Sequence, residues 1–383
     1  MLRDTLFCEI DSLKDKYIEA WRAVSEIESP TLHKSGVDAV GNYFVGLAEE
    51  LGFSVERLPL INAGDVIVIT MNPDADAAPI CLSGHMDTVH PLGSFGTPAC
   101  RIEGDRIYGP GVTDCKGGII AGLLCMEALA RVGYKKRPIM LLLQSDEEMG
   151  SRPSEKKSIN YICERAKGAR AFFNLEPGDG KGAVLTRKGI NVFTFTVKGK
   201  SAHSSRSATE GASAILEAAH KIIECEKFKD ADGITVNCGV ISGGTVSNTV
   251  PDTCVFKADV RYSTPEERKY IISKMEEIAR TVHVPGTECT LTYGKGRPPM
   301  TYSERNARLL DDINEIYKEN GMTPLSPSSA TGGSDAAYFT IAEIPCLDNF
   351  GAHGGKIHSP EEYAIISSLF DTAKRLSIAA YYL

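Results

Sequence analysis

The sequence predicts an α/β protein in which a small α+β domain is inserted into a larger one. Apolar runs typical of buried strands alternate with helix-like segments up to about residue 187. Near residue 188 the pattern changes to the order β-α-β-β-α-β, which is typical of a ferredoxin-like unit. From about residue 297 the first pattern resumes. We therefore expect a larger domain formed by residues 1–187 and 297–383, with residues 188–296 as the inserted domain.

In the larger domain, continuous apolar strands alternate with helices, which implies a sheet covered on both faces. The expected strands are 66–71, 80–83, 139–143, 171–175 and 344–347. The expected helices are 11–26, 37–51, 116–132, 303–320 and a last one from Glu361. Gly52 and Gly133 follow two of these helices, where glycine commonly ends a helix.

In the inserted domain, residues 190–197 alternate between apolar and polar side chains, which predicts a strand with one buried face. Further strands are expected at 234–241, 253–262 and 288–293, and a helix at about 208–226. The segment Thr264–Glu267 predicts the start of a second helix, because it combines a capping box with a proline at the first helical position.

Composition excludes several classes of protein. The formal charge of -8 over 383 residues argues against a general nucleic-acid binder. The longest uncharged apolar stretch, 117–126, is too short to span a membrane, and the first residues have no apolar core of signal-peptide length. The 11 cysteines include no C-x-x-C pair, which favours reduced thiols in a cytoplasmic protein over a disulfide framework.

Acids and histidines follow several of the expected strands. His85 and Asp87 follow the strand at 80–83, Glu147 and Glu148 follow the strand at 139–143, and Glu176 follows the next. Each signal is weak alone: a histidine at a strand end is more often a satisfied polar residue, adjacent acids usually form a solvated loop, and a glutamate before proline often begins a turn.

A further acid, Asp114, ends a glycine-containing loop and precedes a helix, where an aspartate is commonly only an N-cap. Because the carboxyl ends of parallel strands share one edge of a sheet, these side chains could converge on one crevice. Converging carboxylates repel one another strongly without a cation. His85, Asp114, Glu148 and Glu176, with one more histidine, would form a mixed nitrogen and oxygen site suited to zinc, manganese or cobalt.

The order of these motifs resembles the co-catalytic zinc metallopeptidase family of carboxypeptidase G, acetylornithine deacetylase, succinyl-diaminopimelate desuccinylase and aminoacylase. The resemblance covers nearly the whole chain, and its motifs are weak singly but specific together. The matching segments are 83–89, 109–118, 147–148, 176–177, 202–204 and 358–361. Segments 296–298, 332–338 and 358–359 look closest to the glutamate carboxypeptidase branch.

The resemblance implies a zinc-peptidase-like catalytic domain, with a mixed, largely parallel sheet, and a ferredoxin-like lid and dimerisation domain. It also implies two zinc ions per subunit, for which cobalt or manganese could substitute. The implied ligands are His85 and Glu176 for one ion, Glu148 and His358 for the other, and Asp114 as the bridge between them. On chemistry alone His353 could replace His358, but the Ser-Pro-Glu that follows His358 matches the family.

The resemblance assigns the remaining catalytic roles to acids beside the ligands. Asp87 would orient His85, and Glu147 would be the general base. Adjacent residues of an extended segment point in opposite directions, so Glu148 can face the metal while Glu147 faces the attacking water.

Two residues of the inserted domain match positions through which family members contact the active site of a partner subunit. His203 would support the oxyanion and Asn248 would supply a second polar contact. Both imply a homodimer through residues 188–296. A lone loop histidine is otherwise usually solvated.

Arg297 precedes two prolines and is interpreted as a clamp on a substrate carboxylate, although a surface arginine near a hinge is the alternative. Gly333 lies in a turn before a helix whose first amides could bind the same anion. Both features indicate an N-acyl amino acid or a small peptide as the substrate.

The expected function is zinc-dependent hydrolysis of amide bonds in small carboxylate-bearing substrates, as in a glutamate carboxypeptidase. The alternatives within the family are an N-acyl-amino-acid deacylase and a di- or tripeptidase. A non-catalytic ligand-binding homologue is disfavoured because the ligands and the base are all present. A single-metal or redox site is disfavoured by the bridging carboxylate and the lack of a set of cysteine ligands.

Overall fold

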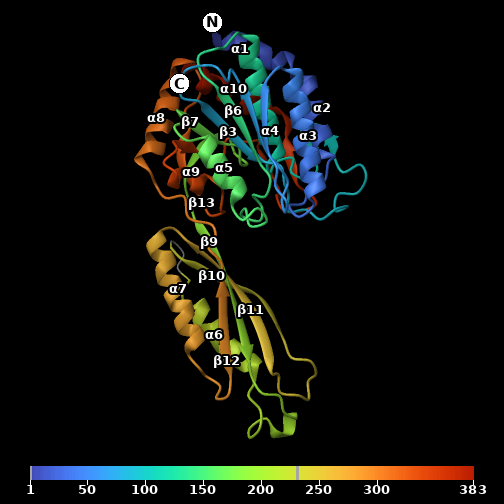
Figure 1. The fold of residues 1–383 in the computed structure, drawn as a ribbon, viewed down its shortest axis with the longest axis vertical. Coiled ribbons are helices and arrows are strands. Elements are labelled where there is room, and N and C mark those ends of the chain that lie inside the picture. Colours follow the sequence, from blue (N-terminus) through green and yellow to red (C-terminus); the bar gives the residue numbers. More distant parts are fainter. Residues whose placement is uncertain (1, 230–232) are drawn as a thin grey trace. The chain divides into compact units, whose positions relative to one another are not determined.

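A computed structural model describes residues 2–229 and 233–383 (Figure 1). The chain divides into two compact units. The larger unit comprises residues up to Leu185 together with Tyr302–Ser329 and Ser334–Leu383, and the smaller unit comprises Thr186–Thr301 and Ala330–Gly333. Within the described residues, no helix is both long and apolar enough to cross a membrane.

The larger unit is built on a six-stranded sheet with the strand order β1-β2-β6-β3-β7-β14. The strands are β1 (Ser54–Leu58), β2 (Val66–Met71), β3 (Ile80–His85), β6 (Ile139–Gln144), β7 (Ala171–Asn174) and β14 (Cys346–Leu347). β6, β3, β7 and β14 pair in parallel, whereas β1 pairs with β2 and β2 with β6 in antiparallel fashion. The expected mixed, largely parallel sheet is therefore confirmed.

Helices cover both faces of this sheet. One face shares a continuous apolar core with α1 (Leu2–Ser12), α2 (Lys14–Ser25), α3 (Lys34–Glu50), α4 (Lys116–Arg131), α8 (Glu304–Glu319) and α10 (Ile366–Tyr382). The other face packs against α5 (Lys157–Arg165) and α9 (Ala336–Ile341), where the rings of Phe172 and Phe339 lie 3.9 Å apart. Almost every residue of α4 is buried, which explains why its sequence is apolar all round.

A second, four-stranded sheet in the larger unit has the order β15-β16-β5-β4. Its strands are β4 (Arg101–Glu103), β5 (Arg106–Tyr108), β15 (Gly354–Gly355) and β16 (Tyr363–Ile365). β5 and β16 are antiparallel neighbours, so the loop after β5 lies beside the segment before β16 although about 250 residues separate them in sequence. This sheet was not expected from the sequence, because its strands are short.

The smaller unit has the predicted ferredoxin-like order of elements (Figure 1). Its sheet has the order β10-β11-β9-β12, and α6 and α7 pack on one face. The elements are β9 (Gly189–Lys198), α6 (Ala214–Glu226), β10 (Thr235–Gly243), β11 (Thr253–Tyr262), α7 (Pro265–Arg280) and β12 (Glu288–Tyr293). Thr264 caps α7 by accepting a hydrogen bond from the Glu267 amide, as its capping box predicts.

Several elements differ from the expected ones. The helix expected from residue 208 begins only at Ala214, because the Ser213 hydroxyl caps it and residues 204–206 form a separate 3-10 turn. The last helix begins at Ile366 rather than near Glu361, because β16 precedes it. α1 and α5 were missed, and so were the paired strands β8 (Gly182–Arg187) and β13 (Ser326–Ala330).

The division of the chain also differs in detail from the expected one. Arg297, which the sequence boundaries assign to the larger domain, belongs to the smaller unit because its backbone pairs with that of Ile190. Gly333 also belongs to the smaller unit. A Cβ atom placed on Gly333 would lie 2.9 Å from Cδ of Arg297, so these two residues are close neighbours.

Candidate metal centre

The candidate site begins where the parallel strands of the larger unit end. β3 lies between β6 and β7, and its last residue, His85, is in register with Gln144 at the end of β6. β7 ends at Asn174, whose side-chain amide donates hydrogen bonds to Ser334 and Asp348, each at 2.9 Å. Glu147, Glu148 and Glu176 follow these strand ends within a few residues, which places all of them at one edge of the sheet.

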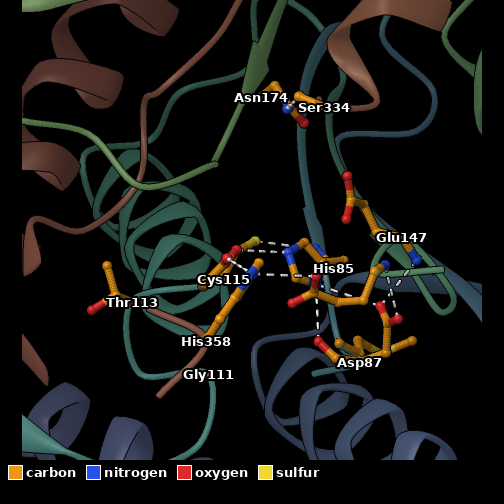
Figure 2. Close-up of polar contacts among 12 residues, drawn as sticks. His85, Asp87, Gly111, Thr113, Cys115, Glu147, Asn174, Ser334 and His358 are labelled. Carbon is orange, nitrogen blue, oxygen red and sulfur yellow. Dashed lines mark hydrogen bonds and ion pairs between the residues drawn. The ribbon is translucent and has the colours of Figure 1, made fainter. Parts of the chain in front are cut away.

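The side chains converge into two groups that share Asp114. His85, Asp114 and Glu176 form one group, and Asp114, Glu148 and His358 form the other, with the donor atoms of each group within 4.8 Å of one another. Oδ1 of Asp114 lies 3.0 Å from Nε2 of His85, and its Oδ2 lies 3.3 Å from Nε2 of His358. The carboxylate thus presents one oxygen to each histidine. Figure 2 shows the side chains of His85 and His358 pointing toward one another.

Close approach of α4 makes this convergence possible. A Cβ atom placed on Gly118, in the first turn of α4, would lie 2.2 Å from the Leu175 carbonyl oxygen. Only glycine therefore lets the start of this helix, which follows Asp114, reach the segment that carries Glu176. His358 itself adopts φ 63, a left-handed conformation that is uncommon for residues other than glycine.

Asp87 organises more of the site than the sequence indicated. Its side chain is fully buried, and its two oxygens accept hydrogen bonds from the backbone amides of Glu147 and Glu148, both at 3.1 Å. The Thr31 hydroxyl donates a third, at 2.7 Å. Nδ1 of His85 lies 2.9 Å from the Asp87 backbone carbonyl and 3.4 Å from its carboxylate. One aspartate therefore orients both a histidine and the Glu147–Glu148 pair.

Glu147 is buried, and its backbone lies in a turn rather than in an extended segment. The Glu147 carbonyl accepts a 2.6 Å hydrogen bond from the Gly150 amide. We expected an extended backbone to point Glu147 and Glu148 in opposite directions. That reason is wrong, because the chain forms a turn at these residues. Asp87 instead holds the backbone amides of both residues, and Figure 2 shows the Glu147 carboxylate directed away from that aspartate.

The electrostatics of the site indicate an excess of negative charge. Burial raises the pKa of Glu148 and Glu176 well above the usual range, and the nearby charges of Asp114 and Glu147 raise both further. Burial alone would also raise the pKa of Asp114, but its contacts with His358 and His85 outweigh that effect and lower it. A divalent cation would relieve this repulsion, so the residues present fit a metal site.

Cys115 lies beside the site without the properties of a nucleophile. Its Sγ accepts a hydrogen bond from the His85 amide at 3.1 Å, and burial raises the pKa of its thiol to about 12. His353, the alternative to His358, is in neither group, and the Cβ position at Gly180 lies 2.6 Å from its ring.

Glu362, a buried carboxylate that contacts the loop before Asp114, is not among the site residues predicted from the sequence. The signal was present in the acidic pair that follows Pro360 near His358, but sequence alone gave no reason to connect it with a loop so distant in the chain.

The remaining candidate residues belong to the smaller unit. His203 and Asn248 are exposed on adjacent segments, since His203 pairs with Thr249 and the Ser204 amide donates to the Asn248 carbonyl at 2.9 Å. Arg297 is held by reciprocal backbone hydrogen bonds with Ile190 at 2.8 and 2.9 Å. The smaller unit thus places His203 on a segment beside that of Asn248, and Arg297 next to Gly333.

Comparison with known proteins identifies relatives along most of the chain. The family model described as Peptidase family M20/M25/M40 matches residues 81–381. Carboxypeptidase G2 of Pseudomonas sp. (strain RS-16) is 31% identical over 372 residues, which cover 95% of this chain and 87% of that protein.

Two solved structures show the same fold. A tripeptidase from Staphylococcus aureus has a TM-score of 0.79 at 22% identity, covering 96% of this chain and 98% of that one. A dinuclear metal-binding peptidase from Bacillus subtilis has a TM-score of 0.68 at 16% identity, covering 97% and 98%.

Proposed function

We propose that this chain, which belongs to peptidase family M20/M25/M40 and is a hydrolytic enzyme, uses two zinc ions to cleave amide bonds in small substrates that carry a free carboxylate. The observation that carries this proposal is the pair of donor groups sharing Asp114. Nitrogen and oxygen donors suit zinc, and cobalt or manganese would be workable substitutes. The 11 free cysteines support a reducing, cytoplasmic environment.

In this proposal each residue has a defined task. The cations would be held by His85, Asp114, Glu148, Glu176 and His358, and they would supply Lewis acidity to the amide carbonyl and to the attacking water. Glu147 accepts the proton of that water and later delivers it to the leaving amine. Asp87 holds the amide of Glu147 and thereby fixes the position of the base. His203 donates to the oxyanion that forms on the substrate.

The substrate carboxylate is assigned to Arg297, with Gly333 beside it. A guanidinium forms two parallel hydrogen bonds with a carboxylate, and the absence of a side chain at Gly333 leaves room next to Cδ of Arg297. These features favour N-acyl amino acids and small peptides that present a free C-terminal carboxylate. An N-acyl-amino-acid deacylase or a di- or tripeptidase would use the same clamp with a different acyl pocket.

We expect the enzyme to hydrolyse N-acyl glutamates in preference to their α-carboxamides. Arg297→Ala should lose this preference for the free carboxylate. The variant should raise KM at least about tenfold, because a charge-assisted pair contributes roughly 1.5–3 kcal/mol, while kcat changes little. The measurement is kcat and KM for an N-acyl glutamate and for its α-carboxamide with zinc, cobalt or manganese. The amide substrate is the control, since Arg297→Ala should not affect it. An unchanged KM for the acid would exclude the clamp.

We also propose that the chain forms a homodimer through the smaller unit. β10 is an edge strand of its sheet and exposes Val240 and Ile241 by 58% and 53%, and α6 exposes Ile223 by 57%. An exposed apolar edge strand is a surface that proteins normally cover. In such a dimer, His203 and Asn248 would contact the active site of the partner subunit.

A complementation experiment tests the contact between subunits. Glu147→Gln and His203→Ala should each be nearly inactive alone, but their hybrid dimer combines an intact base with an intact histidine in one site. When equal amounts of the two variants exchange subunits at random, about half of the dimers are hybrids, and each hybrid has one intact site of two. The mixture should therefore recover roughly a quarter of the wild-type activity. Light scattering gives the number of chains. A fully active monomer, or no recovery in verified hybrids, would contradict the proposed role of His203.

A further inference from the structure

Glu362 is a buried carboxylate to which the proposed reaction assigns no role. Its side chain is fully buried. It accepts hydrogen bonds from the backbone amides of Gly111 at 3.1 Å, Thr113 at 2.8 Å and Asp114 at 3.0 Å. Nε2 of His90 lies 2.7 Å from the same carboxylate. Four donors fill the acceptor capacity of this buried carboxylate, since each oxygen then has two partners.

All three amides belong to the loop that presents Asp114. The backbone of the same segment adds two further contacts: the Glu362 carbonyl accepts from the Gly109 amide at 3.4 Å, and the Tyr363 carbonyl accepts from the Thr113 hydroxyl at 2.6 Å. The loop from Gly109 to Asp114 is therefore fixed along its length by two adjacent residues. This is the loop that follows β5, whereas Glu362 immediately precedes β16 and Tyr363 is its first residue.

Glu362 also lies four residues after His358, and its amide donates to the Ser359 carbonyl at 3.0 Å. One side chain therefore ties the segment that carries His358 to the loop that carries Asp114. His358 and Asp114 belong to the same donor group, and their side chains lie 3.3 Å apart. Glu362 thus connects the two segments that place these side chains beside each other.

We propose that Glu362 is a positioning residue that holds Asp114 and His358 in the arrangement required to bind both cations. This inference rests on the proposed function, because it assumes that these residues are ligands. A carboxylate is required at this position because it only accepts hydrogen bonds. Three of its partners are backbone N–H groups, which can only donate them. Partners that orient metal ligands typically affect metal affinity by roughly 10- to 100-fold.

Glu362→Gln tests this role with little change in volume. Its amide group would place N–H donors against the donors of the loop, so at least one amide would lose its acceptor. We expect the affinity for the more weakly held zinc to fall by roughly 10- to 100-fold in competition with a chelator. kcat should fall at limiting zinc and recover in excess zinc, whereas KM stays unchanged. Glu361→Gln is the matched control, because Glu361 is adjacent but exposed and its side chain pairs with Lys356.

Thermal unfolding of the metal-free proteins separates positioning from general stability. A purely structural role would lower the melting temperature of metal-free Glu362→Gln and leave its zinc affinity unchanged, and that result overturns the inference. If Glu362→Gln does not fold, Glu362→Asp keeps the buried charge but shortens its reach, and it should show the same loss of affinity. Wild-type protein that binds no pair of ions would instead overturn the proposed function itself.

Discussion

Replacing Glu147 with glutamine should lower kcat by roughly 10²- to 10⁴-fold while both cations stay bound. Glutamine keeps the size of the side chain but has no basic oxygen to take the proton of the attacking water. Glu147 is in neither donor group, so the metal content should not change. KM should also stay close to the wild-type value, because the lost interaction acts in the transition state. The measurements are steady-state kinetics and elemental analysis of the same preparation.

Glu148→Gln is the matched control for this experiment. It makes the same chemical change one residue away, but at a side chain that lies 3.5 Å from His358 within a donor group. It should therefore lose metal as well as activity, and excess metal should restore part of the activity. Glu147→Gln protein that retains full turnover with both cations bound would contradict the assignment of the base.

The larger features of the fold could be predicted from sequence because they depend on local patterns. The apolar runs of β2, β3, β6 and β7 stand out as buried strands, and the capping box at Thr264 marks the start of α7. The resemblance to the co-catalytic metallopeptidases is confirmed by the family match over residues 81–381. The convergence of His85, Glu148 and Glu176 follows from parallel pairing alone, since parallel strands end at one edge.

Other features depend on pairings between distant residues and left no local signal. β5 and β16 have three residues each, which is too short to show the alternation of apolar and polar side chains that marks a strand. They also pair with each other across most of the chain. The contacts of Glu362 with the loop before Asp114 have the same origin. An extended backbone was expected at Glu147 and Glu148, but the chain forms a turn there, and the amides of both residues donate hydrogen bonds to Asp87. In each case the missing information was a long-range polar contact.

Asp114→Asn should have the largest effect on metal binding, because Asp114 is the residue shared by both donor groups. Its two oxygens face different histidines, at 3.0 and 3.3 Å. Asparagine keeps one oxygen and replaces the other with an N–H₂ donor, which cannot bind a cation. We expect affinity for at least one ion to fall by more than roughly 100-fold, and activity to fall at least as far.

The comparison with Glu176→Gln sharpens this prediction, because Glu176 belongs to one group only. That variant should keep the ion of the Glu148–His358 group. Thermal unfolding with added zinc provides an independent readout: a ligand at 100 times its Kd stabilises a folded protein by about 2.7 kcal/mol. Zinc should stabilise the wild-type protein against unfolding by the full amount and Glu176→Gln by part of it. The stabilisation should be smallest for Asp114→Asn. If Asp114→Asn bound two ions with wild-type affinity, the bridge would have to be another carboxylate, and the pairing of the two donor groups through Asp114 would be wrong.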